Sequence, residues 1–217
     1  PTGDLGAFHL KITVKRDVLL NAVRKASYLS RGISAVSYLS YLLLDAENDS
    51  LRVYGSDMEG RIQIKIDSEV EEPGSVTVHG KRILGILSSL LEETVNLEST
   101  EQGHLKLSTK NSKYLLYGIK TDDSNREFEF VGGDEVSVPG SLMLGALAQA
   151  DYAAMEGYEK PEFQSVHFFI EDGILGFLSG NISRFTEASV KVLSEKSVSA
   201  TVPESSAKVI QRVLSEA

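Results

Sequence analysis

The stretch Lys11-Ile-Thr-Val-Lys-Arg-Asp-Val-Leu-Leu-Asn-Ala-Val23 contains the pattern that decides the fold. Its first four residues alternate between polar and apolar side chains, which is typical of a short strand. After Val14, apolar residues follow at offsets of five, six, eight and nine: Leu19, Leu20, Ala22 and Val23. Those offsets describe one stripe of a helix with about 3.6 residues per turn. The stretch therefore predicts a strand that leads directly into an amphipathic helix.

The same pattern occurs three more times along the chain. Short alternating strands are predicted at 76–78 and 136–138. Their last residues, Val78 and Val138, are followed by apolar residues at the same four offsets, and Val202 by a stripe shifted by about two residues. The four valines lie 64, 60 and 64 residues apart. Such spacing indicates an internal repeat of one structural unit. The later stripes are Ile83, Leu84, Ile86 and Leu87; Met143, Leu144, Ala146 and Leu147; and Val209, Ile210, Val213 and Leu214.

Between the helices the apolar period changes from 3.6 to 2, which is typical of strands. Turn residues divide each intervening segment into three short strands. They are expected at 38–44, 51–54 and 61–66; at 95–98, 104–108 and 113–119; and at 163–171, 174–178 and 184–192. Such short turns join antiparallel neighbours. Each repeat is predicted as β-α-β-β-β, and the fold class as α+β with helices on one side of antiparallel sheets.

The repeats also predict the domain organisation. One repeat cannot cover its own sheet, but two repeats can pair their helices over it. We expect a first domain at 10–121, an acidic linker at 122–134 and a second domain at 135–217. The second domain is predicted to be incomplete, because the fourth repeat stops after its helix. We expect the native protein to continue past Ala217.

The charges are unevenly distributed. The chain has 22 basic and 31 acidic residues, a net charge of −9, which excludes a uniformly basic nucleic-acid-binding surface. Basic residues nevertheless gather on three of the predicted helices, and the third helix has none. This distribution suits a protein with one side turned to a polyanion, although exposed helix faces commonly carry Lys and Arg. The candidates are Arg24, Lys25, Arg31, Lys81, Arg82, Lys208 and Arg212.

No motif for catalysis or metal binding is present. The chain has no cysteine, which excludes disulfides and thiolate metal sites and favours a reducing, cytoplasmic location. The four histidines are far apart, and no nucleophile elbow or phosphate-binding glycine loop occurs. Asp57 and Glu59 lie in a glycine-flanked turn that could hold a divalent ion, but this composition is ordinary for a turn. We predict no catalytic residue, no cofactor and no metal.

Four segments resemble the bacterial β sliding clamp family, the β subunit of DNA polymerase III: Leu10–Leu20, Tyr38–Leu44, Gly55–Glu59 and Glu72–Val78. The resemblance extends from Leu10 to the end of the chain and is looser in the second domain. It implies a clamp fold and a non-catalytic processivity factor that encircles duplex DNA. Family chains have three such domains, and two chains close one ring. The sequence would then hold the first domain and part of the second, without the third.

The resemblance also implies the partners and their sites. Duplex DNA would be contacted without sequence preference by the basic candidates. The polymerase catalytic subunit, the clamp loader and repair factors would bind through short apolar peptides. Their pocket corresponds to Lys160, Phe163, Gly180, Ile182, Ser183, Arg184 and Phe185. Ile182 and Phe185 could instead be core residues of a strand. At full length a homodimer is implied, with Tyr114 and Leu116 as apolar contacts of the ring interface, and no membrane partner.

Three alternative functions remain open from the sequence. A two-domain trimeric clamp of the proliferating cell nuclear antigen type suits the length. A diverged clamp-like scaffold for protein interactions is favoured by the second domain, where Glu204 and Ser205 replace the basic residues that often open the fourth helix. An enzyme using Asp57 and Glu59 with a metal is the third.

Overall fold

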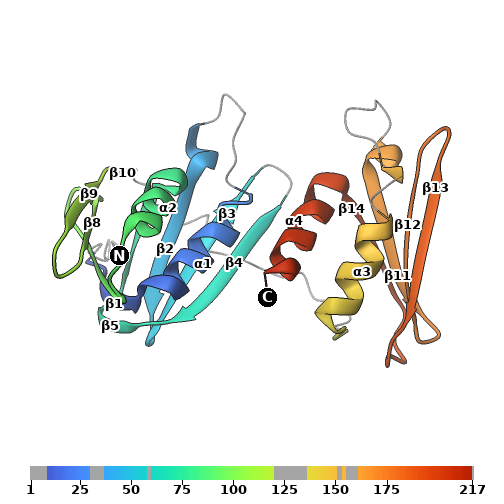
Figure 1. The fold of residues 1–217 in the computed structure, drawn as a ribbon, viewed down its shortest axis with the longest axis horizontal. Coiled ribbons are helices and arrows are strands. Elements are labelled where there is room, and N and C mark those ends of the chain that lie inside the picture. Colours follow the sequence, from blue (N-terminus) through green and yellow to red (C-terminus); the bar gives the residue numbers. More distant parts are fainter. Residues whose placement is uncertain are drawn as a thin grey trace, which may run out of the picture. The chain divides into compact units, whose positions relative to one another are not determined.

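The computed structural model describes residues 9–29, 37–57, 60–119, 136–150, 153–154 and 161–216. The chain divides into two compact units, Pro1–Phe128 and Glu129–Ala217, called unit one and unit two below. The predicted linker at 122–134 lies outside the described residues. Each unit combines helices with antiparallel strands, so the predicted α+β class is confirmed (Figure 1).

Unit one contains the predicted β-α-β-β-β pattern twice. The first copy comprises β1 (Lys11–Lys15), α1 (Arg16–Ala26), the short 3-10 helix η1 (Ser37–Ser40), β2 (Tyr41–Glu47), β3 (Ser50–Ser56) and β4 (Arg61–Asp67). The second comprises β6 (Gly74–His79), α2 (Gly80–Ser89), β7 (Thr94–Ser99), β8 (Leu105–Ser108) and β9 (Lys113–Leu116). Two short strands, β5 (Glu69–Glu72) and β10 (Gly118–Ile119), were not predicted as separate elements.

The two repeats of unit one exchange their first strands. One sheet has the order β5-β1-β7-β8-β9 and the other β10-β6-β2-β3-β4. Strand β1 therefore pairs with β7 of the second repeat, while β6 pairs with β2 of the first. Since each sheet needs a strand from both repeats, neither repeat can form its sheet alone. This exchange explains why two repeats make one compact unit.

The predicted strand 113–119 is divided between the two sheets. Leu116 in β9 pairs with Leu105, whereas Gly118 in β10 pairs with Val78 of the other sheet. A Cβ atom at Gly118 would lie 1.9 Å from the carbonyl oxygen of Gly103. Only glycine allows this close approach of two backbones. The expectation of one continuous strand was therefore wrong.

Both helices of unit one bury the predicted stripe in a shared core. On α1 this stripe comprises Leu19, Leu20, Ala22 and Val23, all at most 8% exposed. On α2, Ile83 and Leu87 are fully buried, and the two helices contact each other (Figure 1). Each fully buried leucine contributes about 1.5–3 kcal/mol to burial energy. The opposite side of each helix faces solvent.

Unit two contains one sheet in its described residues. Its elements are α3 (Gly140–Ala150), the 3-10 helix η4 (Pro161–Gln164), β11 (Ser165–Glu171), β12 (Ile174–Gly180), β13 (Phe185–Lys191), β14 (Val198–Pro203) and α4 (Glu204–Ser215). The sheet order is β13-β12-β11-β14. Helices α3 and α4 contact each other on one side of this sheet (Figure 1). Strand β14 pairs with β11 just as β6 pairs with β2.

The strand predicted at Val136–Val138 does not form. Residues 136–139 have no regular secondary structure, although both valines pack against the core of unit two. In unit one the corresponding strand, β1, pairs with β7, which belongs to the following repeat. The part of unit two that the structure describes has no such following meander. Without a ladder partner, an alternating sequence alone does not make a strand.

Candidate nucleic-acid interface

Helix α1 places two basic side chains away from its buried stripe. Arg24 is exposed and Lys25 is half-buried, while their neighbours Val23 and Ala26 are in the core. Both cations lie in the last turn of the helix, where the helix dipole stabilises positive charge. Helix stability alone can therefore account for them. Arg31, the third basic candidate of this region, lies outside the described residues.

Helix α2 carries its two basic residues at the opposite end. Lys81 and Arg82 are exposed in the first turn, which contains no acidic residue. Positive charge at a helix N-terminus is disfavoured by the dipole. These two residues therefore weaken the helix slightly, which indicates a role other than local stability. Helices α1 and α2 contact each other and together carry four of the predicted basic residues outside their buried stripes, called the basic face: Arg24, Lys25, Lys81 and Arg82.

His79 adjoins the basic face, just before α2. Its ring lies edge-on to Tyr41, with the ring centroids 5.3 Å apart. Burial, and then the positive charges of Arg82 and Lys81, hold the pKa of His79 below its usual range. The histidine is therefore uncharged at neutral pH. Sequence reasoning placed no function on His79, although its position beside two cations was visible.

We expect the free energy of unfolding of unit one to fall as the pH decreases from about 7 to about 5. The unfolded chain protonates His79 more readily than the folded chain does, because folding lowers the pKa of this histidine. Its stabilising contribution is thus complete above the ordinary pKa of about 6.5 and is lost toward the lower folded-state pKa. Urea unfolding across this range is the measurement.

The matched variants for this pH dependence are His79→Gln and His9→Gln. The first should flatten the dependence, and the second, in exposed His9, should leave it unchanged. Folding also lowers the pKa of the Glu92 and Glu98 carboxyls, through hydrogen bonds from Thr109 and Lys106. Their contributions are lost only below about pH 4.5, outside this window. An unchanged slope in His79→Gln would show that another group titrates.

The basic candidates of α4 differ from those of unit one. Lys208 forms an ion pair, one helical turn apart, with the buried carboxylate of Glu204. A buried carboxylate needs such a partner, so Lys208 has a structural role in unit two. Arg212 is exposed in the last turn of α4. Unit two is thus less suited to binding phosphate than unit one.

The turn between β12 and β13 displays the residues predicted for partner peptides. Ile182 is 73% exposed and Phe185 is 69% exposed, so neither is a core residue. Asn181 shapes the turn: its side-chain oxygen accepts hydrogen bonds from the backbone N–H groups of Ser183 and Arg184, both at 2.9 Å. Its amide nitrogen donates to the carbonyl oxygen of Ala153 at 2.8 Å. The turn and the first residue of β13 thus hold two apolar side chains in solvent.

Of the other predicted pocket residues, the structure describes all but one. Gly180 ends β12 beside this turn, and Arg184 is exposed within it. Phe163 is half-buried in η4, and Lys160 lies outside the described residues.

The residues predicted for the ring interface need correction. Tyr114 packs against the core of unit one, and Leu116 is only 4% exposed. Alternation along β9 directs these two side chains inward and that of Leu115 outward. Leu115 is 51% exposed and Tyr117 is 63% exposed. Since β9 is an edge strand, Leu115 within it and Tyr117 directly after it are apolar side chains available to another chain. The sequence showed the alternation but not which face is buried.

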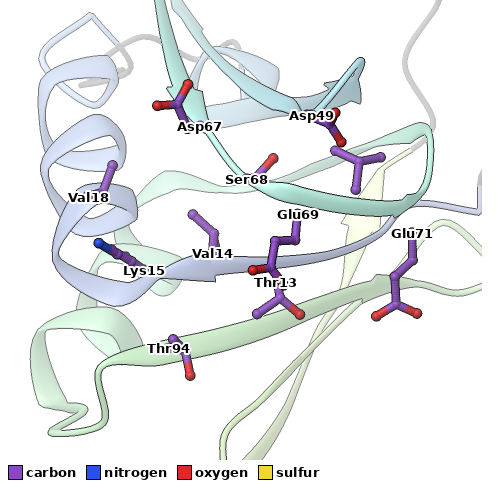
Figure 2. Close-up of a pocket in the computed structure, with 11 residues that line it drawn as sticks. Thr13, Val14, Lys15, Val18, Asp49, Asp67, Ser68, Glu69, Glu71 and Thr94 are labelled. Atoms are coloured by element: carbon purple, nitrogen blue, oxygen red, sulfur yellow. The ribbon is translucent and has the colours of Figure 1, made fainter.

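A groove on unit one separates α1 from the corner between β4 and β5. Figure 2 shows Val18 and Lys15 on one wall, and Asp67, Glu69 and Glu71 along the other. Its volume is about 750 Å³. Sequence reasoning missed this groove, because its residues come from β1, α1, β4, β5, β7 and two turns.

No metal-binding cluster and no membrane-spanning helix was found in the described residues. They contain no group of three or more His, Asp or Glu side chains placed to hold a metal ion. The Asp57 carboxylate accepts a hydrogen bond from the Gly60 N–H at 2.7 Å, as expected for a turn, and Glu59 lies outside the described residues. None of the described helices is long and apolar enough to cross a membrane.

Comparison with known proteins agrees with this architecture. Residues 10–126 match the model of the DNA polymerase III beta subunit, N-terminal domain. The beta sliding clamp of Micrococcus luteus is 29% identical over 175 residues, covering 78% of this chain and 54% of that protein. The beta sliding clamp of Staphylococcus epidermidis is 24% identical over 174 residues, covering 76% and 46%. The chain thus spans about half the length of the curated relatives it matches.

Solved structures show the same fold. The DNA polymerase sliding clamp of Bacillus subtilis superimposes with a TM-score of 0.83 at 19% identity, covering 94% of this chain and 57% of that one. The DNA polymerase III beta subunit of Thermotoga maritima gives 0.82 at 20%, covering 96% and 57%. The resemblance noted in the sequence is therefore confirmed. The family model matches more than half of the residues of this chain, and the chain therefore belongs to the DNA polymerase III β subunit family, the bacterial β sliding clamps.

Proposed function

We propose that this chain is part of a DNA sliding clamp, a ring-forming and non-catalytic processivity factor that encircles duplex DNA. The observation that carries the proposal is the basic face of α1 and α2 in a chain with a net charge of −9. A ring holds DNA by topology and needs only weak phosphate contacts, which carry no sequence information. Tight contacts would oppose sliding. A few cations on an otherwise acidic protein suit this requirement.

The proposed ring forms from two copies of the full-length protein. The edge strand β9, with Leu115 and Tyr117 exposed, supports a role in ring closure. Open strand edges readily pair with another chain, and two apolar side chains add burial there. A trimeric ring of the proliferating cell nuclear antigen type is the alternative. The native mass of the full-length protein distinguishes the dimer from the trimer.

The proposed partners are the polymerase catalytic subunit, the clamp loader and repair factors, in the cytoplasm. The exposed Ile182 and Phe185 support a surface for short apolar peptides, because neighbouring apolar side chains in solvent are typical of an interaction site. The absence of cysteine supports the cytoplasmic location. Arg184 in the same turn could bind a peptide carboxylate.

The proposed function is tested by retention on circular DNA. The full-length protein, loaded on nicked circular duplex, should remain bound during gel filtration and dissociate when the circle is cut. Retention that is equal on linear and circular DNA would indicate ordinary binding, and no retention on either would remove the clamp function. The second result would favour a protein-interaction scaffold, which the Lys208–Glu204 ion pair and the exposed turn of unit two also suit.

A further inference from the structure

The groove beside the β4–β5 corner has an apolar floor. Val14 is buried there, Val70 is half-buried and Val18 is 40% exposed. The hydrogen bond from the Ser68 N–H to the Asp49 carbonyl oxygen, 3.1 Å long, fixes the corner to the β2–β3 turn. The groove is therefore a defined feature of unit one. Figure 2 shows Val14 near Glu69, and Val18 on α1 at the opposite wall.

The rim of the groove is acidic. Asp49, Asp67 and Glu69 have no ion-pair partner in the part of the chain that the structure describes. Glu71 is paired with Lys11, whose ammonium lies 2.5 Å from it. The pairing raises the pKa of Lys11, mainly through the hydrogen bond to Glu71. Lys15 is the only cation among the lining residues. Three carboxylates thus remain available beside an apolar surface.

This arrangement selects for an elongated ligand. The described carboxylates do not converge as the ligands of one metal ion must. Separated negative charges instead match separate cations on one flexible chain. The groove also adjoins β5, an edge strand of its sheet, where an extended segment can lie alongside. An apolar floor then accommodates a small side chain between two charged ones.

We propose that this groove docks an extended segment of a partner protein that carries Lys or Arg on both sides of a small apolar residue. The cations contact Asp49, Asp67 and Glu69, and the apolar residue packs on Val18 and Val70. Both the charge and the shape of the groove support this occupant. In this respect the groove differs from the basic face, which has the opposite charge.

The test is a peptide titration of the full chain followed by backbone and valine methyl NMR signals. The probe is an acetylated hexapeptide of alternating lysine and valine. It should cause saturable shifts at Val14, Val18 and Val70, and added salt should weaken the binding. Peptides in which glutamate replaces lysine, or serine replaces valine, should bind more weakly.

Matched variants separate the groove from general electrostatics. Asp67→Asn/Glu69→Gln should weaken binding of the lysine–valine peptide about five- to tenfold. The control Glu101→Gln/Asp172→Asn removes the same charge from two exposed turns and should leave binding unchanged. Equal weakening in both variants, or no saturable shift in the parent chain, would overturn the proposal.

Two further outcomes are decisive. An alternative role for acidic residues on an edge strand is to prevent pairing with other chains. If the parent chain does not bind the peptide and Asp67→Asn/Glu69→Gln self-associates, the carboxylates have that role and the proposal is wrong. A variant with Lys81→Glu/Arg82→Glu should bind the peptide like the parent chain. This variant therefore tests peptide docking independently of DNA binding.

Discussion

The Gly55→Ala variant is expected to lose about 3 kcal/mol or more of the free energy of unfolding of unit one. Gly55 lies in β3 under the last turn of α1. A Cβ atom there would lie 2.1 Å from the carbonyl oxygen of Ala26 and 2.9 Å from its carbonyl carbon. The obstacle is backbone, which cannot rotate away as a side chain can. The helix must lift off the sheet, and the core beneath it would open.

Gly85→Ala is the matched control for this prediction. Gly85 lies in α2, and a Cβ atom there would meet nothing within 4 Å beyond its own stretch of helix. Alanine should stabilise the helix by about 0.5–1 kcal/mol, because glycine loses more backbone entropy on folding. Urea denaturation followed by amide signals of unit one measures both variants. Similar stabilities for Gly55→Ala and the parent chain would show that α1 does not pack on β3 as described.

The Lys81→Glu/Arg82→Glu variant is expected to bind duplex DNA at least about tenfold more weakly than the parent chain at low salt. Both side chains are exposed at the start of α2, and both would be turned from attraction to repulsion of phosphate. The logarithm of the binding constant should also depend less steeply on the logarithm of salt concentration, by about two units of slope. Fluorescence anisotropy with a labelled duplex measures both quantities.

The control for the charge reversal is Lys65→Glu/Lys110→Glu. These exposed lysines lie in β4 and in the β8–β9 turn, away from the basic face. The net charge changes by the same amount in both variants, so a purely global effect would weaken binding equally. Equal weakening would therefore contradict the assignment of DNA binding to the basic face. The loss should be the same for duplexes of different sequence, because phosphate contacts carry no sequence information.

The elements of the fold could be predicted from local patterns. Each meander and each helix appears in the sequence as a change of apolar period, and the stripe around Leu19 and Leu20 is buried as expected. Such patterns report burial within one element. For this reason the α-helices and meanders of the described residues were found without any knowledge of the partners of each strand.

The long-range pairing could not be predicted in this way. The exchange of β1 and β6 between the sheets depends on which strands meet, and a strand sequence does not specify its neighbour. The same limit explains the failed strand at 136–138, which has the right alternation but no ladder partner. It also explains the division of 113–119, where Gly118 belongs to the other sheet.

For the candidate sites, too, local patterns could be predicted and the long-range arrangement could not. The basic residues of α1 and α2 were visible because helix periodicity separates buried from exposed positions. The assignment of Leu116 to an interface failed because alternation defines two faces of a strand without saying which one the core covers. The acidic groove was missed because its lining comes from distant parts of the chain, from Thr13 to Thr94.

Paramagnetic relaxation of the chain by spin-labelled duplex DNA tests most directly whether the paired helices of unit one face the double strand. A nitroxide attached to a backbone phosphate should broaden the amide signals of Arg24, Lys25, Lys81 and Arg82, and the broadening should persist when the base sequence is changed. Broadening confined to the strands, for example at Lys65 or Lys106, would contradict the account, as would the absence of any broadening.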